Sequence, residues 1–138
     1  MEQNFTLLHK VSQPLPVVEG MLTDLVAFGQ LHPLMERVES LGQGLYRVYE
    51  FKPLPLGLKI RFHYDALVSI ETESRSILYQ AWPNGMQIEI RFKLSESTDA
   101  VSTVVEESVR IQGFFLFIGL LKKAVMESHK TLFANMKI

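Results

Sequence analysis

Two ionisable residues interrupt stretches that otherwise alternate as strands do, and they are the first candidates for chemistry. His9 lies in stretch 5–11 and Glu107 in stretch 101–112, each among apolar residues of the same face. Because successive side chains of a strand point to opposite faces, both are expected to point inward. A buried carboxylate is costly unless it is paired, and an imidazole would offset that cost. The two residues are therefore candidates for an acid–base pair or for an anchor of a ligand's polar end.

Structural explanations account for the same pattern. In one explanation, His9 and Glu107 form a buried pair that satisfies each other's hydrogen-bonding groups and has only a structural role. In the other, a local strand irregularity turns Glu107 toward solvent. Such structural roles are commoner than functional ones, so the sequence leaves the role of the pair open. If the role is functional, Glu107→Gln is expected to weaken ligand binding or turnover and to leave the fold intact.

The remaining histidines give weaker signals. His32 precedes Pro33 at the end of a helical stretch, where a turn-capping or surface histidine is expected. His63 alternates with charged residues and is expected to be solvated. His129 borders the apolar stripe of the last helical stretch, where a core or boundary histidine is commoner than a ligand contact.

Three aromatic residues are candidates for contact with a ligand. Tyr64 and Tyr79 lie on or near the inward faces of their strands, where a phenol offers packing area and a hydrogen-bonding tip. Core packing with incidental hydroxyl groups explains them as well. Trp82, just before the turn 83–85, is expected at the rim of a cavity or in plain packing.

Motifs for metal, nucleotide or covalent chemistry are absent from the sequence. The histidines are scattered without the spacing of a zinc site, and the chain contains no cysteine. No phosphate loop, dinucleotide fingerprint or nucleophile elbow is present. We therefore expect no metal and no cofactor, whereas the sequence leaves open whether the protein is an enzyme.

Length and composition predict one globular domain over residues 1–138. The chain is 47% hydrophobic and 21% charged, which is typical of a folded protein. Its net charge of −1 and its lack of basic runs argue against nucleic acid as a partner. The N-terminus lacks the pattern of a signal peptide, and the apolar run 114–121 is too short to span a membrane. We expect a cytoplasmic protein with no transmembrane segment and an unspecified oligomeric state.

Alternating runs between turn signals predict a series of strands. Residues 14–31 have helical spacing and predict one helix, or two short ones divided near Asp24, ending before Pro33. Residues 113–138 predict a long amphipathic helix. The strands are expected at 5–11, 34–41, 45–52, 58–72, 75–82, 86–95 and 101–112.

The longest strand has the clearest alternation and predicts one dry face and one wet face. Residues 45–52, in contrast, do not indicate which face is buried, because both of their alternating sets are mixed. A sheet with one dry face needs a cover, and the final helix is expected to supply it. The predicted dry face of the longest strand consists of Leu58, Ile60, Phe62, Tyr64, Ala66, Val68 and Ile70.

This order of elements resembles the helix-grip (SRPBCC) superfamily, which includes START lipid-transfer domains, Bet v 1-like proteins and polyketide cyclase/dehydrase-like proteins. The resemblance covers the whole chain and rests on the passages 13–18 and 31–38 and on the aromatic-rich start of the last helix. It implies an α+β fold: a seven-stranded curved antiparallel sheet, two short helices after the first strand, and a long C-terminal helix over an apolar cavity. In that fold the first and last strands are neighbours, so His9 and Glu107 are expected to meet. A lipocalin-like barrel and a cystatin-like or nuclear-transport-factor-like fold fit less well, since neither needs a long final helix.

The resemblance implies binding or transport of a hydrophobic or amphipathic small molecule, such as a lipid, a sterol or a polyketide-like compound. An alternative is a cyclase, dehydratase or isomerase that uses His9 and Glu107. A further alternative is a module that docks on a chaperone or another protein, for which an exposed apolar patch and a cavity too small for a ligand are expected. The ligand-binding wall is expected to contain Ile60, Phe62, Tyr64, Tyr79, Trp82, Ile88, Ile90, Val105, Phe117, Leu121 and Val125.

Overall fold

The computed structural model describes residues 2–99, 101–113 and 115–136, and it describes the side chains of all of these except residues 84 and 115–118. The strands are β1 (Glu2–Val11), β2 (Met35–Gly42), β3 (Leu45–Pro53), β4 (Lys59–Glu71), β5 (Ser76–Ala81), β6 (Gln87–Glu96) and β7 (Thr103–Gln112). The helices are α1 (Leu15–Thr23), α2 (Leu25–Leu31) and α3 (Phe115–Asn135), with short 3₁₀ turns η1 (Pro55–Gly57) and η2 (Pro83–Gly85). The predicted α+β class and the predicted order of elements are confirmed.

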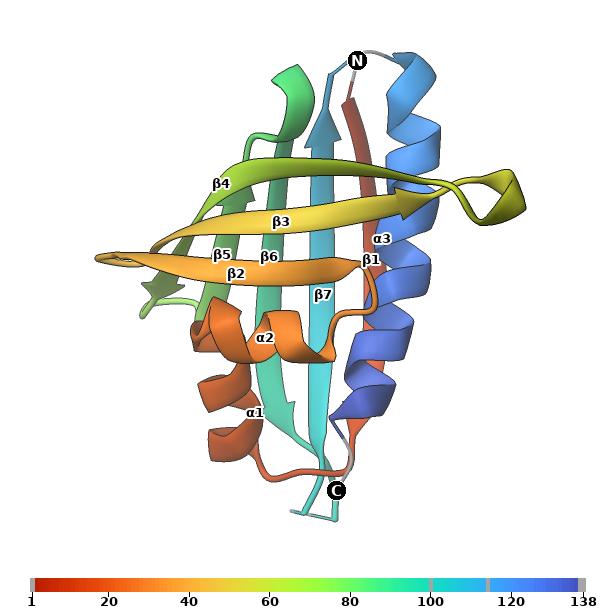
Figure 1. The fold of residues 1–138 in the computed structure, drawn as a ribbon. Helices are drawn as coiled ribbons and strands as arrows, with labels where there is room; N and C mark the ends of the chain where they lie inside the picture. Colours follow the sequence, from red (N-terminus) through yellow and green to blue (C-terminus); the bar gives the residue numbers. More distant parts are fainter. Residues whose placement is uncertain (1, 100, 114, 137–138) are drawn as a thin grey trace.

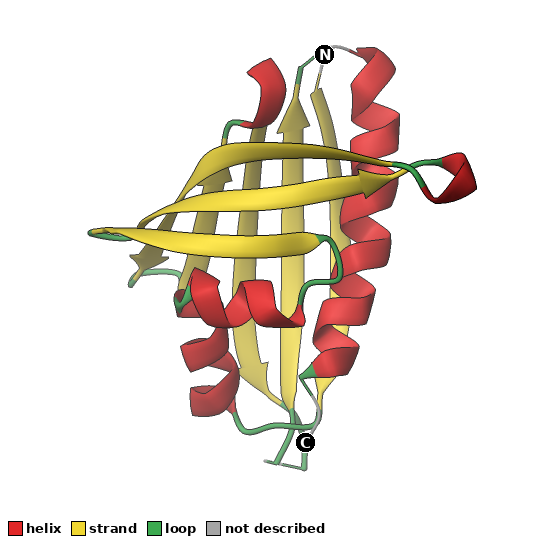
Figure 2. Ribbon diagram, in the orientation of Figure 1, coloured by secondary structure: helices red, strands yellow, loops and turns green. Residues whose placement is uncertain are grey.

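The strands form one antiparallel seven-stranded sheet in the order β1-β7-β6-β5-β4-β3-β2. Figure 1 shows β2, β3 and β4 crossing in front of the other strands at a steep angle, because the twisted sheet curves back on itself. Helix α3 runs along the β1 side of the sheet, and α1 and α2 lie toward one end (Figure 2). The enclosed space between these layers holds the hydrophobic core, which includes Phe28, Phe92 and Leu132.

The two short helices are separated by one extended residue. Asp24 has φ −109° and ψ 104°, and its carboxylate accepts a hydrogen bond from the backbone N–H of Val26 at 3.0 Å. This is the usual way in which an aspartate caps the start of a helix. Helix α2 ends at His32, because the residue before Pro33 is driven out of the helical region. The predicted division near Asp24 is confirmed.

Helix α2 packs unusually close to β2 at Gly29. A Cβ atom built on Gly29 would lie 2.5 Å from Cγ2 of Val38, which is shorter than real carbon contacts. Only glycine therefore allows this approach without movement of the neighbouring side chain. The close packing also fixes His32, which caps the same helix.

The predicted dry face of β4 holds only in the middle of the strand. Ala66 is buried and Phe62, Tyr64 and Val68 are partly buried, as expected. Near the strand ends the side chains are largely exposed, at 61% for Leu58, 52% for Ile60 and 58% for Ile70. The prediction is wrong at these positions because the 13-residue strand reaches beyond the layer that covers its centre.

In the part of the chain that is described, no helix combines the length and the apolar character needed to cross a bilayer. The apolar run 114–121 coincides with the start of α3. Most of its side chains lie outside the described set.

Candidate functional site

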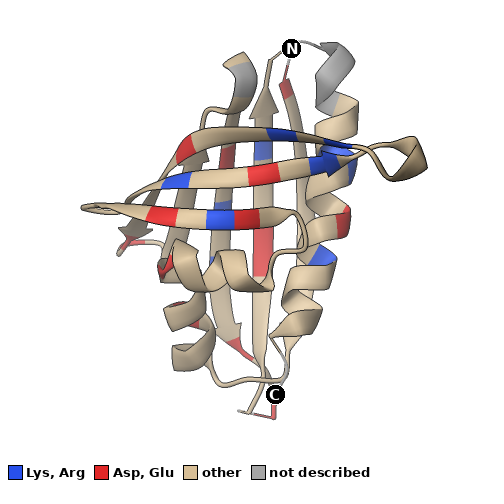
Figure 3. Ribbon diagram, in the orientation of Figure 1, with Lys and Arg blue, Asp and Glu red and all other residues tan. Residues whose placement is uncertain are grey.

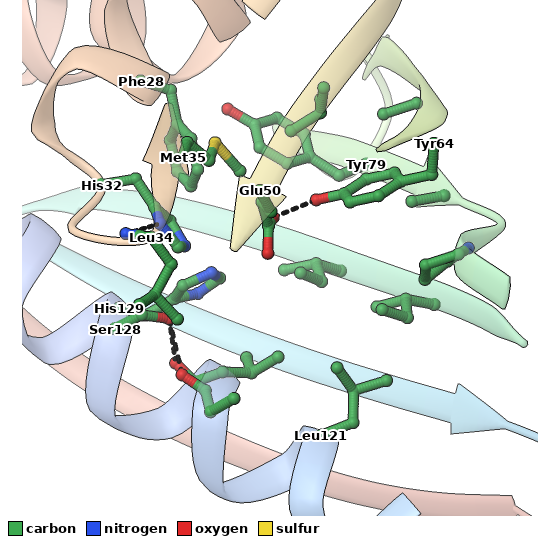
Figure 4. A pocket seen from close by; sticks show the side chains of 18 of the residues that line it. Phe28, His32, Leu34, Met35, Glu50, Tyr64, Tyr79, Leu121, Ser128 and His129 are labelled. Atoms are coloured by element: carbon green, nitrogen blue, oxygen red, sulfur yellow. Dashed lines mark hydrogen bonds between the residues drawn. The ribbon is translucent and has the colours of Figure 1, made fainter. Parts of the chain in front are cut away.

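A cavity of about 80 Å³ lies between the inner face of the sheet and helices α2 and α3 (Figure 4). Its wall is mainly apolar and comes from α2, the segment after it, strands β3 to β6, and α3. Most of the predicted ligand-binding residues lie in this wall: Phe62, Tyr64, Tyr79, Ile88, Ile90, Leu121 and Val125.

The other predicted wall residues lie elsewhere. Ile60 is 52% exposed beyond the covered part of β4, and Trp82 is 47% exposed between β5 and η2. Val105 is fully buried in the core, opposite His9 in the pairing of β7 with β1, and does not reach the cavity. The side chain of Phe117 lies outside the described set. Alternation identified the inward face correctly for Val105, but it does not distinguish core from cavity wall.

Glu107 is the centre of a buried hydrogen-bonded cluster beside the cavity. It is fully buried on β7, and its Oε1 lies 2.9 Å from Nε2 of His9 on β1. The predicted meeting of His9 and Glu107 is thus confirmed. The second carboxylate oxygen, Oε2, bonds to Nδ1 of His129 on α3. Because one carboxylate joins both imidazoles, the pair expected from the sequence is a three-residue cluster.

The charge on Glu107 follows from these partners. Burial by itself raises the pKa of a carboxyl group, but His129 above all, and also His9, outweigh it, so the pKa of Glu107 lies below its usual 4.5. Glu107 is therefore ionised at neutral pH and accepts an N–H from each imidazole. An ionised group with no solvent contact is held in place by exactly these two donors.

His129 connects the cluster to the cavity. It is 4% exposed and lines the wall, whereas His9 and Glu107 do not. With Nδ1 bound to Glu107, Nε2 is the ring nitrogen of His129 that is left for a ligand. His9 instead stacks on Phe133 with ring centroids 4.1 Å apart. His9 does not line the cavity, so contact between His9 and a ligand stays a prediction.

His32 lies beside His129 in the same wall, with ring centroids 5.6 Å apart. Its Nδ1 accepts the backbone N–H of Leu34 at 3.1 Å, so the predicted turn-capping role is confirmed, although the residue is buried. Burial, and then the proximity of His129, lowers the pKa of His32 to about 3. His32 is therefore neutral at physiological pH and carries its proton on Nε2, as a hydrogen-bond donor.

Glu50 and Tyr64 form a second polar group in the wall (Figure 4). The Tyr64 hydroxyl donates a hydrogen bond to Oε1 of Glu50 on the neighbouring strand β3. Burial raises the pKa of Glu50 to about 7, even though Tyr64 and His129 act in the opposite direction. Burial also raises the pKa of Tyr64 well above 10, so the phenol keeps its proton. Glu50 is thus a carboxyl group that changes protonation near neutral pH.

The Tyr79 hydroxyl is committed to the fold. It donates a hydrogen bond to the backbone carbonyl of Leu22 in α1. The Tyr79 ring packs edge-on against Phe28 and Phe92, with centroids 5.2 and 5.0 Å away. Tyr79 therefore contributes apolar wall, and the expectation that its hydroxyl reaches a ligand does not apply to this arrangement.

Sequence reasoning missed Glu50 and underestimated His129. Glu50 lies on the same face of β3 as Val48, which is fully buried, but both alternating sets of this strand are mixed, so the sequence held no clear signal for Glu50. The position of His129 depends on how α3 is rotated against the sheet, and the helical pattern placed it only at the border of the apolar stripe.

The wall therefore has two polar groups separated by apolar surface: Glu50 with Tyr64, and His129 with His32. Such a combination can orient the polar end of an apolar molecule and can move a proton. Throughout the described ranges, no three histidine or acidic side chains converge in a way that would hold a metal ion.

Comparison with known proteins shows the fold. No model of a protein family and no curated protein matches the sequence. A START superfamily protein from Mycobacterium smegmatis has a similar structure, with a TM-score of 0.76 and 12% identity over 97% of this chain and 94% of that one. The Zhui aromatase/cyclase from Streptomyces sp. R1128 has a TM-score of 0.73 and 14% identity over 99% of this chain and 92% of that one. Ara h 8.0201 has a TM-score of 0.67 and 15% identity over 99% of this chain and 95% of that one. The predicted helix-grip fold is confirmed, and at these identities the similarity extends to the fold alone.

Proposed function

We propose that this protein binds a small amphipathic molecule in the cavity between the sheet and α3. The observation that carries the proposal is a mainly apolar wall that includes polar atoms held by protein partners, Glu50 by Tyr64 and His129 by Glu107. Ligand sites in proteins typically combine an apolar lining with a few fixed polar groups.

The polar groups favour an uncharged, oxygen-containing end on the ligand. Neutral His32 offers an N–H, and Glu50 offers an O–H when it is protonated. Both suit a carbonyl or hydroxyl oxygen. An anionic end would meet Glu50 in its ionised form above a pH of about 7, which would repel it.

The cavity volume limits the size of the ligand. About 80 Å³ is roughly half of the ~150 Å³ apolar cavity that holds benzene in another protein. A ligand of lipid or polyketide size therefore requires wall side chains to move. Several lining residues are only partly buried and have room to move, among them Phe62, Tyr64, Leu121, Leu34 and Met35.

Native mass spectrometry of the purified protein, with organic extraction of any bound compound, tests the proposal. We expect one apolar adduct per chain, and we expect Ala124→Phe to remove it, because Ala124 lines the cavity on α3. Ala134→Phe is the matched control, since it places the same side chain at an exposed position of the same helix. An adduct that persists in the folded Ala124→Phe protein would place the ligand elsewhere and contradict the proposal.

Catalysis of proton transfer is a second candidate function, favoured by the contact between Glu107 and His129. In this reading His129 Nε2 removes a proton next to a substrate carbonyl, and Glu107 orients His129 and stabilises the imidazolium that forms. Protonated Glu50 then donates its proton to a departing hydroxyl group, so that water leaves and a carbon–carbon double bond forms. Turnover of a β-hydroxy carbonyl compound that disappears in His129→Asn would favour the enzyme, while unchanged binding without turnover would favour the carrier.

A further inference from the structure

The turn between β3 and β4, here called the hairpin tip (residues 53–60), exposes large apolar side chains. Leu56 is 97% exposed, Leu58 is 61% exposed and Ile60 is 52% exposed. Figure 1 shows the tip projecting beyond the outline of the other elements. Single exposed apolar residues are common on protein surfaces, but three along one projecting turn indicate a contact surface.

The backbone of the tip holds Leu56 outward. Leu56 has φ 64° and ψ 27°, a left-handed conformation that leucine rarely adopts, and Gly57 follows with φ 74°. The turn is closed by a hydrogen bond from Leu54 N–H to the Leu58 carbonyl at 2.8 Å. A glycine or asparagine would suit position 56 better if only the turn mattered. An exposed leucine in a disfavoured conformation therefore indicates a use for its side chain.

The strand ends behind the tip are positively charged. Residues 51–64 contain Lys52, Lys59 and Arg61 and no acidic residue. Figure 3 shows an uncharged outermost turn, with cationic positions where the adjoining strands β3 and β4 meet it. Arg61 is paired with Glu36 at 3.0 Å, whereas Lys52 and Lys59 are exposed, and Nζ of Lys59 lies 4.4 Å from the ring centroid of Phe51. The surface thus combines an apolar point with two available cations.

We propose that the hairpin tip docks on an anionic lipid bilayer. Leu56 and Leu58 would enter the boundary between head groups and acyl chains, and Lys52 and Lys59 would lie at the level of the phosphates. Apolar side chains beside lysines are the usual combination for interfacial binding. A protein groove or a second copy of the chain would also accept the leucines, but three cations and no acidic residue within positions 51–64 favour a surface dense in negative charge.

Vesicle flotation with the full-length chain tests the proposal, using phosphatidylcholine vesicles with and without phosphatidylglycerol. We expect binding to the anionic vesicles that weakens as salt is raised. Leu56→Ser/Leu58→Ser should lower the partition coefficient by about tenfold or more, since each leucine loses most of its transfer free energy. Lys52→Gln/Lys59→Gln should lower it by roughly thirtyfold on anionic vesicles, because each lysine near such a surface contributes about 1 kcal/mol.

The matched control is Leu41→Ser at the turn between β2 and β3, the other end of the β3 strand, where Leu41 is 44% exposed. This variant should bind vesicles as the unmodified protein does. No binding to anionic vesicles at low salt, or equal binding by the Leu56→Ser/Leu58→Ser protein, would overturn the proposal. A dimer that dissociates in that variant, without vesicle binding, would instead identify the tip as a contact between copies.

The docking proposal is independent of the cavity ligand. Ala124→Phe fills the cavity far from the tip in sequence, so it should leave vesicle binding unchanged. If the protein carries the adduct but does not bind vesicles, only the docking proposal is rejected. If the protein binds vesicles but carries no adduct, only the ligand proposal is rejected.

Discussion

Glu107 binds Nδ1 of His129 and leaves Nε2 for the cavity, so the orientation of this imidazole in the cavity wall is defined. His9 bonds to the same carboxylate from the far side, which keeps Glu107 ionised without solvent. In the proposed function, the orientation of His129 toward a ligand depends on the charge of Glu107, which does not line the cavity. We therefore propose that Glu107 is a positioning residue.

Glu107→Gln should weaken ligand binding several-fold while the far-UV circular dichroism spectrum stays unchanged. The amide keeps one acceptor oxygen, but its NH₂ group opposes one of the two imidazole N–H donors. We also expect a loss of about 2–3 kcal/mol in the free energy of unfolding, because a buried charged hydrogen bond is broken. Urea titration and binding of the extracted ligand measure the two effects.

His9→Asn provides the comparison. It should lower stability but change affinity less than Glu107→Gln, since His9 does not line the cavity. Equal affinity in the Glu107→Gln and unmodified proteins would show that the cluster serves only the fold.

Glu50 makes stability depend on pH in the direction opposite to an ordinary salt-bridged carboxylate. Its pKa is about 7 in the folded chain against 4.5 as the ordinary value, so between these values the folded state holds a proton that the unfolded state has released. The free energy of unfolding therefore falls as the pH rises through this window. Below the window Glu50 does not change it, and above the window the full cost of ionising the buried carboxyl group remains.

Glu50→Gln should remove that penalty. The pKa difference of 7 − 4.5 corresponds to at most roughly 3 kcal/mol, and partial exposure of Glu50 reduces the expected gain to about 1–2 kcal/mol. The gain should be seen in urea titrations above a pH of about 7 and should vanish near 4.5. A variant whose advantage is the same at both ends of the window would show that Glu50 does not titrate as described.

At this scale, the alternation of the strands was enough to predict that His9 and Glu107 point inward, and their meeting was expected because the resemblance implied that their two strands are neighbours. It did not predict His129, because the rotation of a helix against a sheet depends on packing between residues distant in sequence. It did not predict Glu50 either, since both faces of its strand carry mixed residues.

At the scale of elements, the position of α2 depends on one missing side chain. Gly29→Ala should destabilise the protein by about 1–2 kcal/mol, since crowding against Val38 costs about 1–3 kcal/mol and the better helix propensity of alanine returns up to about 1 kcal/mol. Val38→Ala in the same chain should recover part of the loss, so the double variant should be more stable than the sum of the single effects. Additive effects in urea titrations would mean that the two residues do not press on each other.

The order of strands and helices was predictable because each alternating run is bounded by clear turn residues. The burial of the ends of β4 was not, because exposure of Leu58, Ile60 and Ile70 depends on how far the neighbouring elements extend. Periodicity describes a strand by itself, whereas burial needs a partner of matching length.

At the scale of the whole molecule, the sheet has five interior strands between two edge strands, β1 and β2. Strand β7 pairs with β1 and β6, whereas β2 pairs only with β3. We expect backbone amides of β2 to exchange hydrogen at least about tenfold faster than those of β7, because edge strands open at lower free-energy cost. Mass-spectrometric hydrogen exchange measures this, with β3, which is paired on both sides, as the internal comparison.

Equal protection of β2 and β7 would contradict the prediction. The overall fold followed from the order of elements, but the cavity volume did not, because a filled core and an open cavity have the same apolar pattern in a sequence.

The pairing of β1 with β7 also has a consequence in time. His9 and Glu107 are 98 positions apart, and His129 lies on α3, which follows all seven strands in the chain. During translation β1 emerges before both partners of the cluster. The buried histidine cluster is therefore completed only after α3 has been synthesised, and a nascent chain that stops before α3 would hold His9 and Glu107 without His129.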